Sequence, residues 1–262
     1  FKDFETILDR VETMFKGAYS TGLRLLDQAI LSGTGTDGVR GSLVPKDQTV
    51  LLAPVNVGKT TVSLTMAVFN ALAGNKILFL THEGNPDTIS KNIFACATGM
   101  NYSQLMQARK DPEGRKILAE IANRLDTNMS YVHYEKPGMT IQDVEPLIYR
   151  EQERLLSSNS KLDMIFNDYP ALLRMKGMNN DQERIIQAAV YRYFGQIVAD
   201  VGAHGVSAVQ ANREGSRVVK AGERCLRIED VAEAWGIPQI AATMIFLNRQ
   251  VEGPIKYIMN YF

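Results

Sequence analysis

One segment limits the possible folds of this chain more than any other: an apolar run over residues 49–53, followed by Pro54–Thr61. The apolar run predicts a buried strand, and Gly58-Lys59-Thr60 opens a helix whose later apolar residues repeat at helical spacing. In this setting backbone N–H groups at the helix N-terminus face an anion, Lys59 reaches its outer phosphates, and the Thr60 hydroxyl ligates Mg²⁺. The segment therefore predicts a phosphate-binding loop for ATP and Mg²⁺, formed by Pro54, Val55, Asn56, Val57, Gly58, Lys59, Thr60 and Thr61.

The loop departs from the strict phosphate-loop pattern at one position, because Ala53 stands where that pattern begins with Gly. The alternative interpretation is a chance Gly-Lys-Thr sequence that only caps a structural helix. The strand before the loop and the helix after it favour the nucleotide site over that alternative.

The composition is that of one large α/β domain with a buried sheet, since the chain has 262 residues of which 45% are hydrophobic. Its 29 basic and 29 acidic residues balance, so any binding of nucleic acid has to come from a local cluster of charge. The chain has 2 cysteines, no cationic and apolar leader, and no apolar run near the ~20 residues that span a bilayer. We therefore expect a reducing cytoplasm and no membrane, and, because the chain begins with Phe1, part of a longer protein.

Segments that resemble strands and helices alternate after the phosphate loop. Further apolar runs predict buried strands over residues 76–81, 130–134, 162–167, 206–210 and 244–247. Residues 85–126 are predicted to be mostly helical, as are a charged segment ending near residue 156 and a segment with apolar residues from Ile186 to Val201. Asn180 and Glu183 have the spacing of a capping box for the last of these helices. The alternation predicts an α/β fold with a largely parallel central sheet and helices on both faces.

Residues 1–15 have an amphipathic pattern of their own. Apolar residues recur there at alternating spacings of three and four, at Phe1, Phe4, Leu8, Val11 and Phe15, which predicts a helix. A helix this apolar has to pack on another surface, either its own domain or a neighbouring subunit, and the sequence leaves both open. We divide the chain into a linker or docking helix over residues 1–19 and an ATPase domain over residues 20–262.

Polar residues stand where three of the predicted strands end, and ligands of parallel sheets bind beyond this edge. Asp168 is placed to hold Mg²⁺ or its water, Glu83 to orient or deprotonate the attacking water, and Gln210 to sense the γ-phosphate by hydrogen bonding. Each has a plainer alternative, since an acid or an amide after a strand is also an ordinary loop residue. His82 and His133 are expected to be solvated or hydrogen-bonded rather than metal ligands, because the 3 His and 2 Cys of the chain show no ligand spacing.

Two segments with local positive charge leave the sheet beyond the same edge. One follows the strand that ends near residue 168 and carries Arg174 and Lys176, and the other follows residue 210 and carries Arg213, Arg217 and Lys220. We interpret both segments as loops that contact the phosphates of single-stranded DNA, because a protein that tracks a nucleic-acid backbone needs such cations. Ordinary solvated turns are the alternative for each segment.

These motifs resemble those of the hexameric replicative DNA helicases of the DnaB type, including bacteriophage members, over roughly residues 20–250. The resemblance rests on segments that come in the same order in both: Thr21–Asp27 at the start of the motor domain, Ala53–Thr60, Leu80–Glu83, Asn167–Leu172 and Gln210–Arg213. It implies a RecA-like motor domain that hydrolyses ATP, translocates on single-stranded DNA and unwinds duplex DNA as a homo-oligomeric, hexameric ring. It further implies 5'-3' polarity, suggests a primase and a helicase loader as partners, and points to the cytoplasm of a bacterial or phage-infected cell.

Two positions depart from that family's pattern. Ala242-Thr243 stand where the family usually has an acidic residue before its next strand. Arg249 is followed closely by Gly253-Pro254, whereas the family places a longer loop and another strand before its final Gly-Pro segment. By this resemblance Arg249, or a basic residue close to it, is the candidate arginine finger that one subunit supplies to the site of its neighbour.

Two other classes of protein share the phosphate loop and remain as alternatives. In a DNA-binding filament protein of the recombinase type, ATP switches the affinity for DNA without unwinding; the Gln-Ala-Asn-Arg and Asp-Tyr sequences favour the helicase over this protein. A small-molecule kinase is the weaker alternative, and it predicts a substrate pocket and no stimulation by DNA.

Overall fold

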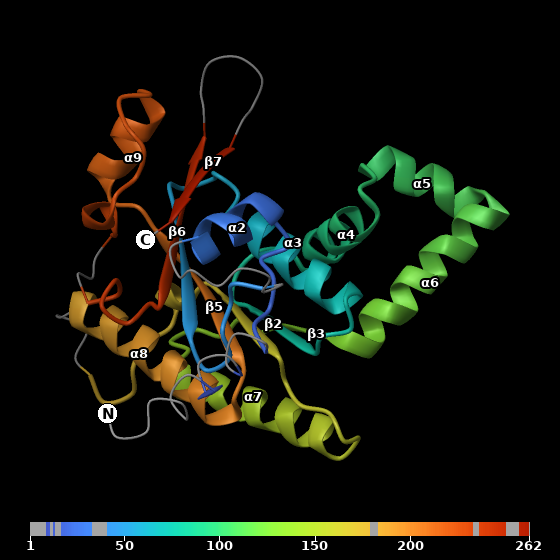
Figure 1. The fold of residues 1–262 in the computed structure, drawn as a ribbon, viewed down its shortest axis with the longest axis horizontal. Coiled ribbons are helices and arrows are strands. Elements are labelled where there is room, and N and C mark those ends of the chain that lie inside the picture. Colours follow the sequence, from blue (N-terminus) through green and yellow to red (C-terminus); the bar gives the residue numbers. More distant parts are fainter. Residues whose placement is uncertain are drawn as a thin grey trace.

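The computed structural model describes residues 9–10, 13, 17–32, 41–178, 183–232, 236–249 and 257–261 of the chain. Its centre is a seven-stranded sheet with the strand order β3-β2-β4-β5-β1-β6-β7, and helices cover both faces of this sheet (Figure 1). The predicted α/β fold with a largely parallel sheet is confirmed.

Six strands run parallel: β1 (Gln48–Ala53), β2 (Ile77–Thr81), β3 (Met129–His133), β4 (Met164–Asp168), β5 (His204–Gln210) and β6 (Thr243–Arg249). They are the six strands that the apolar runs predict, and their ends differ from the predicted ones by two residues or fewer, the usual uncertainty of such boundaries. The seventh strand, β7 (Tyr257–Tyr261), pairs antiparallel with β6 and was not predicted.

The helices are α2 (Arg24–Ser32), α3 (Lys59–Leu72), α4 (Pro86–Thr98), α5 (Tyr102–Lys110), α6 (Pro112–Asn128), α7 (Ile141–Leu156), α8 (Glu183–Val201) and α9 (Arg213–Lys220), with 3₁₀ turns at Pro170–Leu172 and Ile228–Asp230. None of the helices within the described residues combines the length and the apolar character that a membrane span requires.

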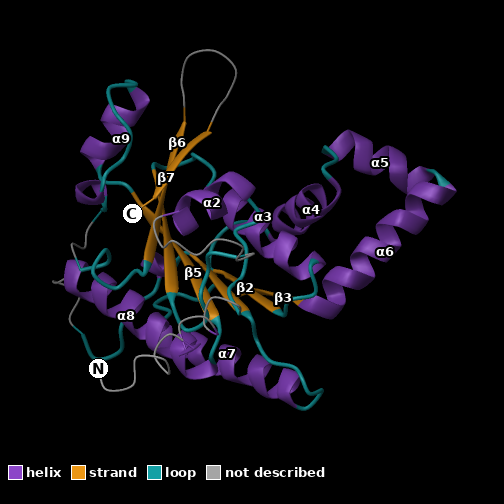
Figure 2. Ribbon diagram, viewed as in Figure 1, coloured by secondary structure: helices purple, strands orange, loops and turns teal. Residues whose placement is uncertain are grey.

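Alternate side chains of the buried strands divide the core into two layers. Phe79 and Phe166 stack with ring centroids 5.7 Å apart on the face that packs on α3, whereas Leu80 and Ile165 face α7 and α8. Figure 2 shows α7 and α8 along one side of the strands and α3 and α4 along the other. Because both faces of the central strands are covered, every residue of β1, β2 and β4 is buried and each of these strands contains an apolar run, whereas β3 at the edge of the sheet is only half-buried.

The segment predicted as mostly helical over residues 85–126 is three helices, α4 to α6. The side chains of Asn85, Asn101 and Asp111 each accept a backbone hydrogen bond at the start of one of these helices, so the breaks are encoded in the capping residues. Helices α5 and α6 project away from the sheet in Figure 1.

The carboxyl end of α6 is tied to the carboxyl end of α3. The Asn128 amide donates to the Ala71 carbonyl (3.0 Å), and the Arg124 guanidinium donates to the Leu72 carbonyl. The Lys76 ammonium adds bonds to the Thr127 carbonyl (3.0 Å) and the Asn128 side chain (2.7 Å). These contacts satisfy helix-end carbonyls that otherwise have no partner within their helices.

Two elements differ from the prediction. Residues 213–220 are predicted as a basic loop but form the helix α9, which Asn212 caps by accepting a bond from the Gly215 N–H (2.7 Å) and which buries Val218 and Val219. Helix α2 lies where the sequence suggests only the approach to a glycine-rich loop. Most of the predicted helix over residues 1–15, and Asn180 of the predicted capping box, lie outside the described residues.

A candidate nucleotide site at the carboxyl edge of the sheet

The strand register brings the predicted site residues to one edge of the sheet. Ala53 at the end of β1 pairs with Gln210 at the end of β5, and Thr81 at the end of β2 pairs with Asp168 at the end of β4. Glu83 lies two residues beyond the end of β2. The phosphate loop, the two acids and the sensor amide therefore leave the sheet side by side, at the edge where parallel sheets bind ligands.

The phosphate loop has the backbone that an anion site needs. Gly58 immediately precedes α3 with φ 100°, a left-handed conformation that glycine adopts at no steric cost, and Asn56 has φ 62°. No side chain caps α3, so the first N–H groups of the helix face outward from its N-terminus. Those N–H groups and the helix dipole favour a phosphate at this position.

Asp168 is a buried acid at this edge of the sheet. Its side chain is only 2% exposed, and neither carboxylate oxygen has a hydrogen-bond partner in the part of the chain that the structure describes. Burial raises the pKa of Asp168 and the charge of Glu83 adds to this rise, whereas the nearby Thr60 hydroxyl and the charge of Lys59 oppose it. A buried carboxylate held next to a Thr hydroxyl fits the donor set that Mg²⁺ takes together with phosphates and waters.

Lys59 and Glu83 flank this carboxylate. Burial lowers the pKa of Lys59, and the nearby charges of Asp168 and Glu83 oppose that effect. The Lys59 ammonium also lies 5.8 Å from the centre of the Tyr169 ring. Glu83 is exposed, as a residue that has to reach a water molecule near a bound phosphate would be.

Gln210 is joined to the same group of residues. Its amide donates a hydrogen bond to the Tyr169 hydroxyl (3.1 Å), and Tyr169 follows Asp168 directly in the chain. The ends of β5 and β4 are thus connected by side chains at the predicted site. Tyr169 is a site residue to which the sequence alone assigned no role, although its place after Asp168 was the available signal.

A groove of about 810 Å³ opens next to the phosphate loop. Its lining includes Val55 of that loop, Gln210, and three cationic side chains from two helices, Arg184 of α8 and Arg213 and Lys220 of α9. Sequence reasoning did not single out Arg184, because no motif marks it and only the folded chain brings the start of α8 to the groove.

Two of the predicted DNA-binding residues are engaged by acids. Arg217 also lines the groove, but its guanidinium forms ion pairs with Glu214 (2.8 Å) and Glu223 (2.9 Å). Arg174 is paired with Glu183 at the start of α8, and neither Arg174 nor Lys176 lines the groove. The sequence could not show these pairings, because the partners become neighbours only once the helices form.

Arg249, the predicted arginine finger, ends β6 at the far side of β1 from β5. Its side chain is not among the described ones, so its role stays a prediction. Within the described residues no group of three or more His, Cys, Asp or Glu side chains is placed to hold a metal ion.

Known proteins with similar sequences are named as replicative helicases. The family described as "DnaB-like helicase C terminal domain" matches residues 21–254 of the chain. The chain is 22% identical over 206 residues to a protein of Chlamydia muridarum named "Probable plasmid replicative DNA helicase", covering 78% of the chain and 43% of the relative. A Chlamydia trachomatis serovar L2 protein of the same name is 22% identical over 241 residues, covering 91% and 49%. The chain thus spans about half the length of the curated relatives it matches.

Solved structures show the same fold. One, whose title describes it as an ATPase domain, superposes with a TM-score of 0.71 at 16% identity and covers 98% of the chain and 93% of its own length. Another, titled "The Structure Of A DnaB-Like Replicative Helicase And Its Interactions With Primase", has the same TM-score and identity and covers 98% and 63%. The fold is therefore the one predicted from the resemblance, and since the family match extends over most of the sequence, the chain belongs to the family of DnaB-like helicase C-terminal domains.

Proposed function

We propose that this chain is the ATP-hydrolysing motor domain of a replicative DNA helicase, which translocates on single-stranded DNA and unwinds duplex DNA. The observation that carries the proposal is the buried Asp168 carboxylate. It lies near Thr60 and Lys59, and neither of its oxygens is well hydrogen-bonded within the described residues. A buried carboxylate without a partner lowers the stability of the fold. Binding of Mg²⁺ would provide that partner. Family membership supports the same function.

Each residue of the site has one role in this proposal. The N–H groups of the phosphate loop and the Lys59 ammonium hold the β- and γ-phosphates of ATP, and the Thr60 hydroxyl and Asp168 hold Mg²⁺ or its waters. Bound Mg²⁺ supplies charge neutralisation at the phosphates. Glu83 accepts a proton from the attacking water as that water approaches the γ-phosphorus. Gln210 donates a hydrogen bond to the γ-phosphate. When hydrolysis removes this phosphate, the bond is lost, and the change reaches α9 through Asn212, which caps that helix.

The groove beside the phosphate loop supports the binding of single-stranded DNA. Arg184, Arg213 and Lys220 line it together with Gln210, so cations for a phosphate backbone stand next to the residue that senses ATP. Arg213 and Lys220 are exposed, whereas Arg217 is neutralised by two glutamates. We expect Arg213 and Lys220 to make the stronger phosphate contacts, with weaker contributions from Arg174, Lys176 and Arg217.

Single-stranded DNA should stimulate ATP hydrolysis, and this stimulation should fall as salt is added. For the double variant Arg213→Ala/Lys220→Ala, the slope of log affinity against log salt should flatten by about 1.4, that is by about 0.7 for each lost phosphate contact. Fluorescence anisotropy with a labelled oligonucleotide at several salt concentrations measures the slope, and a strand-displacement assay measures unwinding.

Arg217→Ala is the matched control for this experiment, because the same charge is removed from the same helix but two acids already neutralise it. We expect a smaller change of slope for this variant. An unchanged slope in the double variant would show that α9 does not contact the DNA. If DNA does not stimulate ATP turnover by the unaltered chain, the small-molecule kinase is favoured.

The site also calls for a neighbouring subunit. Lys59 supplies one cation at the phosphates, and related motors add a second, often an Arg from another subunit. Arg213 is the candidate within the same chain, but it lines the groove that we assign to DNA. We propose that Arg249, or a basic residue near it, supplies the second charge to the next subunit of a homo-oligomer, a closed hexameric ring of identical chains.

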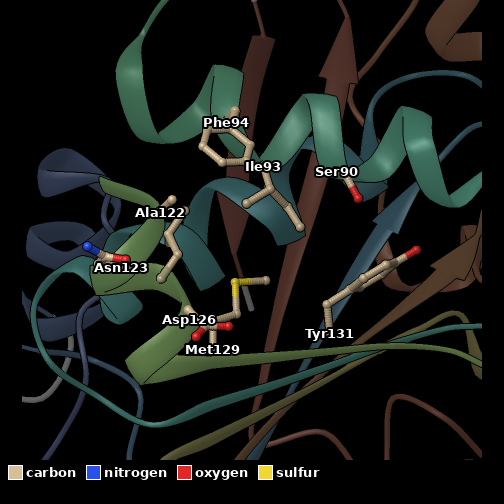
Figure 3. Close-up of a pocket in the computed structure, with 9 residues that line it drawn as sticks. Ser90, Ile93, Phe94, Ala122, Asn123, Asp126, Met129 and Tyr131 are labelled. Atoms are coloured by element: carbon tan, nitrogen blue, oxygen red, sulfur yellow. The ribbon is translucent and has the colours of Figure 1, made fainter. Parts of the chain in front are cut away.

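A pocket between α4, α6 and β3 is the surface that we propose for contact between subunits. It has a volume of about 440 Å³, and its lining is mostly apolar, with Ile93 and Phe94 from α4, Leu125 from α6, and Met129 and Tyr131 from β3 (Figure 3). We propose that residues 1–15 of a second copy occupy it, because the sequence of that segment carries an apolar stripe of its own.

Deleting residues 1–15 should lower both the oligomer size and the ATPase rate per subunit, and the rate of the unaltered chain should rise with protein concentration. Light scattering and steady-state kinetics over a range of concentrations measure both quantities. Phe94→Ser in the pocket should reproduce the defect, whereas Ile117→Ser, which alters an exposed apolar residue of α6 outside the pocket, should not. A monomer with full activity at all concentrations would contradict the proposal.

The recombinase-type filament differs from the helicase in its assembly. Particle images with ATP would show closed rings for the helicase and open filaments for the alternative. A cytoplasmic location, a primase and a helicase loader as partners, and a bacteriophage origin belong to the proposal by family resemblance.

A further inference from the structure

His82 and Asn167 lie on the opposite face of the sheet from the proposed catalytic acids. Successive residues of a strand point to opposite faces, so Asp168 faces α3 with its phosphate loop while Asn167 faces the layer of α7 and α8. The His82 ring contacts Asn167 on that face, whereas Glu83 is close enough to Asp168 and Lys59 to shift the pKa of both. His82 is therefore not placed to touch the nucleotide.

The His82 side chain joins the carboxyl ends of three strands. Its Nδ1 lies 3.0 Å from the carbonyl oxygen of Tyr134, just beyond β3, and its Nε2 lies 2.7 Å from the amide oxygen of Asn167 in β4. Its backbone N–H donates to the Asp168 carbonyl (3.1 Å). The ring is only 2% exposed, so these contacts are made away from water, where an unsatisfied polar group is costly.

The contacts also define which ring nitrogen carries the proton. The Tyr134 carbonyl accepts only, so Nδ1 has to donate to it, and in a neutral ring Nε2 is then an acceptor. Burial lowers the pKa of His82, which favours the neutral ring. The amide nitrogen of Asn167 is buried and has no partner among the described residues, and a half-turn of that amide lets it donate to Nε2.

We infer that His82 is a positioning residue, which holds the ends of β2 and β4 together from the far face of the sheet and thereby fixes Glu83 and Asp168 relative to each other. Within the described residues no hydrogen bond holds the Glu83 carboxylate itself, so its position depends on the backbone that His82 anchors. The inference rests on the proposed function, because it takes Glu83 as the residue that acts on the attacking water.

Three variants of His82 test the inference in the full chain. His82→Leu removes both side-chain bonds and should lower kcat for ATP hydrolysis on the order of ten- to a hundredfold, since small misplacements of a catalytic group are this costly. The KM for ATP should change less than about twofold, because the phosphate loop is untouched. The amide of Gln reaches the position of Nε2 and that of Asn the position of Nδ1, so His82→Gln should keep the Asn167 bond and restore more activity than His82→Asn.

His204→Leu is the matched control. His204 is equally buried and also has two contacts, to the Val44 carbonyl (2.6 Å) and the Thr49 hydroxyl (3.0 Å), but it lies at the start of β5, at the opposite edge of the sheet. With all variants assayed below their unfolding temperatures, kcat of His204→Leu should stay within about twofold of the unaltered chain. Equal losses of kcat in His82→Leu and His204→Leu, or equal activities of His82→Gln and His82→Asn, would overturn the inference. Glu83→Gln in the same series separates the two questions, because full activity there rejects the proposed base whatever His82 does.

Discussion

Replacing Glu83 with Gln should leave ATP bound but slow its hydrolysis by about 10²- to 10⁴-fold, the range that a positioned general base contributes. The amide keeps the size and the position of the side chain but cannot accept the proton of the attacking water. Because Glu83 would act on the water alone, the affinity for ATP should be almost unchanged. Equilibrium binding of a fluorescent nucleotide and single-turnover hydrolysis measure the two effects separately.

Glu135→Gln is a suitable control for this variant. Glu135 also follows a strand of the same sheet, β3, but it lies beside His133 (3.4 Å) rather than beside Lys59 and Asp168. We expect normal hydrolysis when it is replaced. If Glu83→Gln hydrolyses ATP at the rate of the unaltered chain, Glu83 is not the base.

Replacing Lys59 with Ala should lower kcat/KM for ATP by about 10²- to 10³-fold, the loss that accompanies removal of one donor to developing charge. The effect should include binding as well as turnover, because Lys59 contacts the phosphates of the ground state as well as the transferring group. Titration calorimetry with ATP measures the loss of binding, and steady-state kinetics measures the loss of turnover.

Lys91→Ala, which removes an exposed lysine of α4, should leave nucleotide binding unchanged. Unaltered affinity and turnover in Lys59→Ala would show that the loop does not hold phosphates. The two variants should differ in the step that they impair: Lys59→Ala should weaken ATP binding as well as turnover, whereas Glu83→Gln should slow hydrolysis alone.

The strands and the phosphate loop could be predicted from the sequence because their signals are local. Strands β1, β2 and β4 are buried along their whole length, so each contains an apolar run, and the segment between β1 and α3 has a fixed spacing of Gly, Lys and Thr. The two acids were proposed for the same reason, since Asp168 comes directly after one predicted run and Glu83 two residues after another. Their catalytic and metal-binding roles stay predictions.

The remaining features depend on contacts that no local pattern shows. Helix α9 has Gly215 near its start and few apolar residues, and its helical form relies on the Asn212 cap and on burial of Val218 and Val219. The ion pairs of Arg217 with Glu214 and Glu223 form because this segment is folded as it is. The prediction of a loop gave no reason to expect them. Likewise the position of Arg184 in the groove depends on how α8 packs, which the sequence does not specify.

The hydrogen bonds between the ends of α3 and α6 couple the projecting helices α5 and α6 to α3. Helix α3 begins at the phosphate loop, and its far end is bonded to the end of α6, which has 17 residues and is therefore about 25 Å long. A tilt of about 5° at the bonded end displaces the other end of such a helix by about 2 Å. A small rotation of α3 on nucleotide exchange would thus produce a larger displacement where α5 and α6 meet, at the end of α6 away from α3.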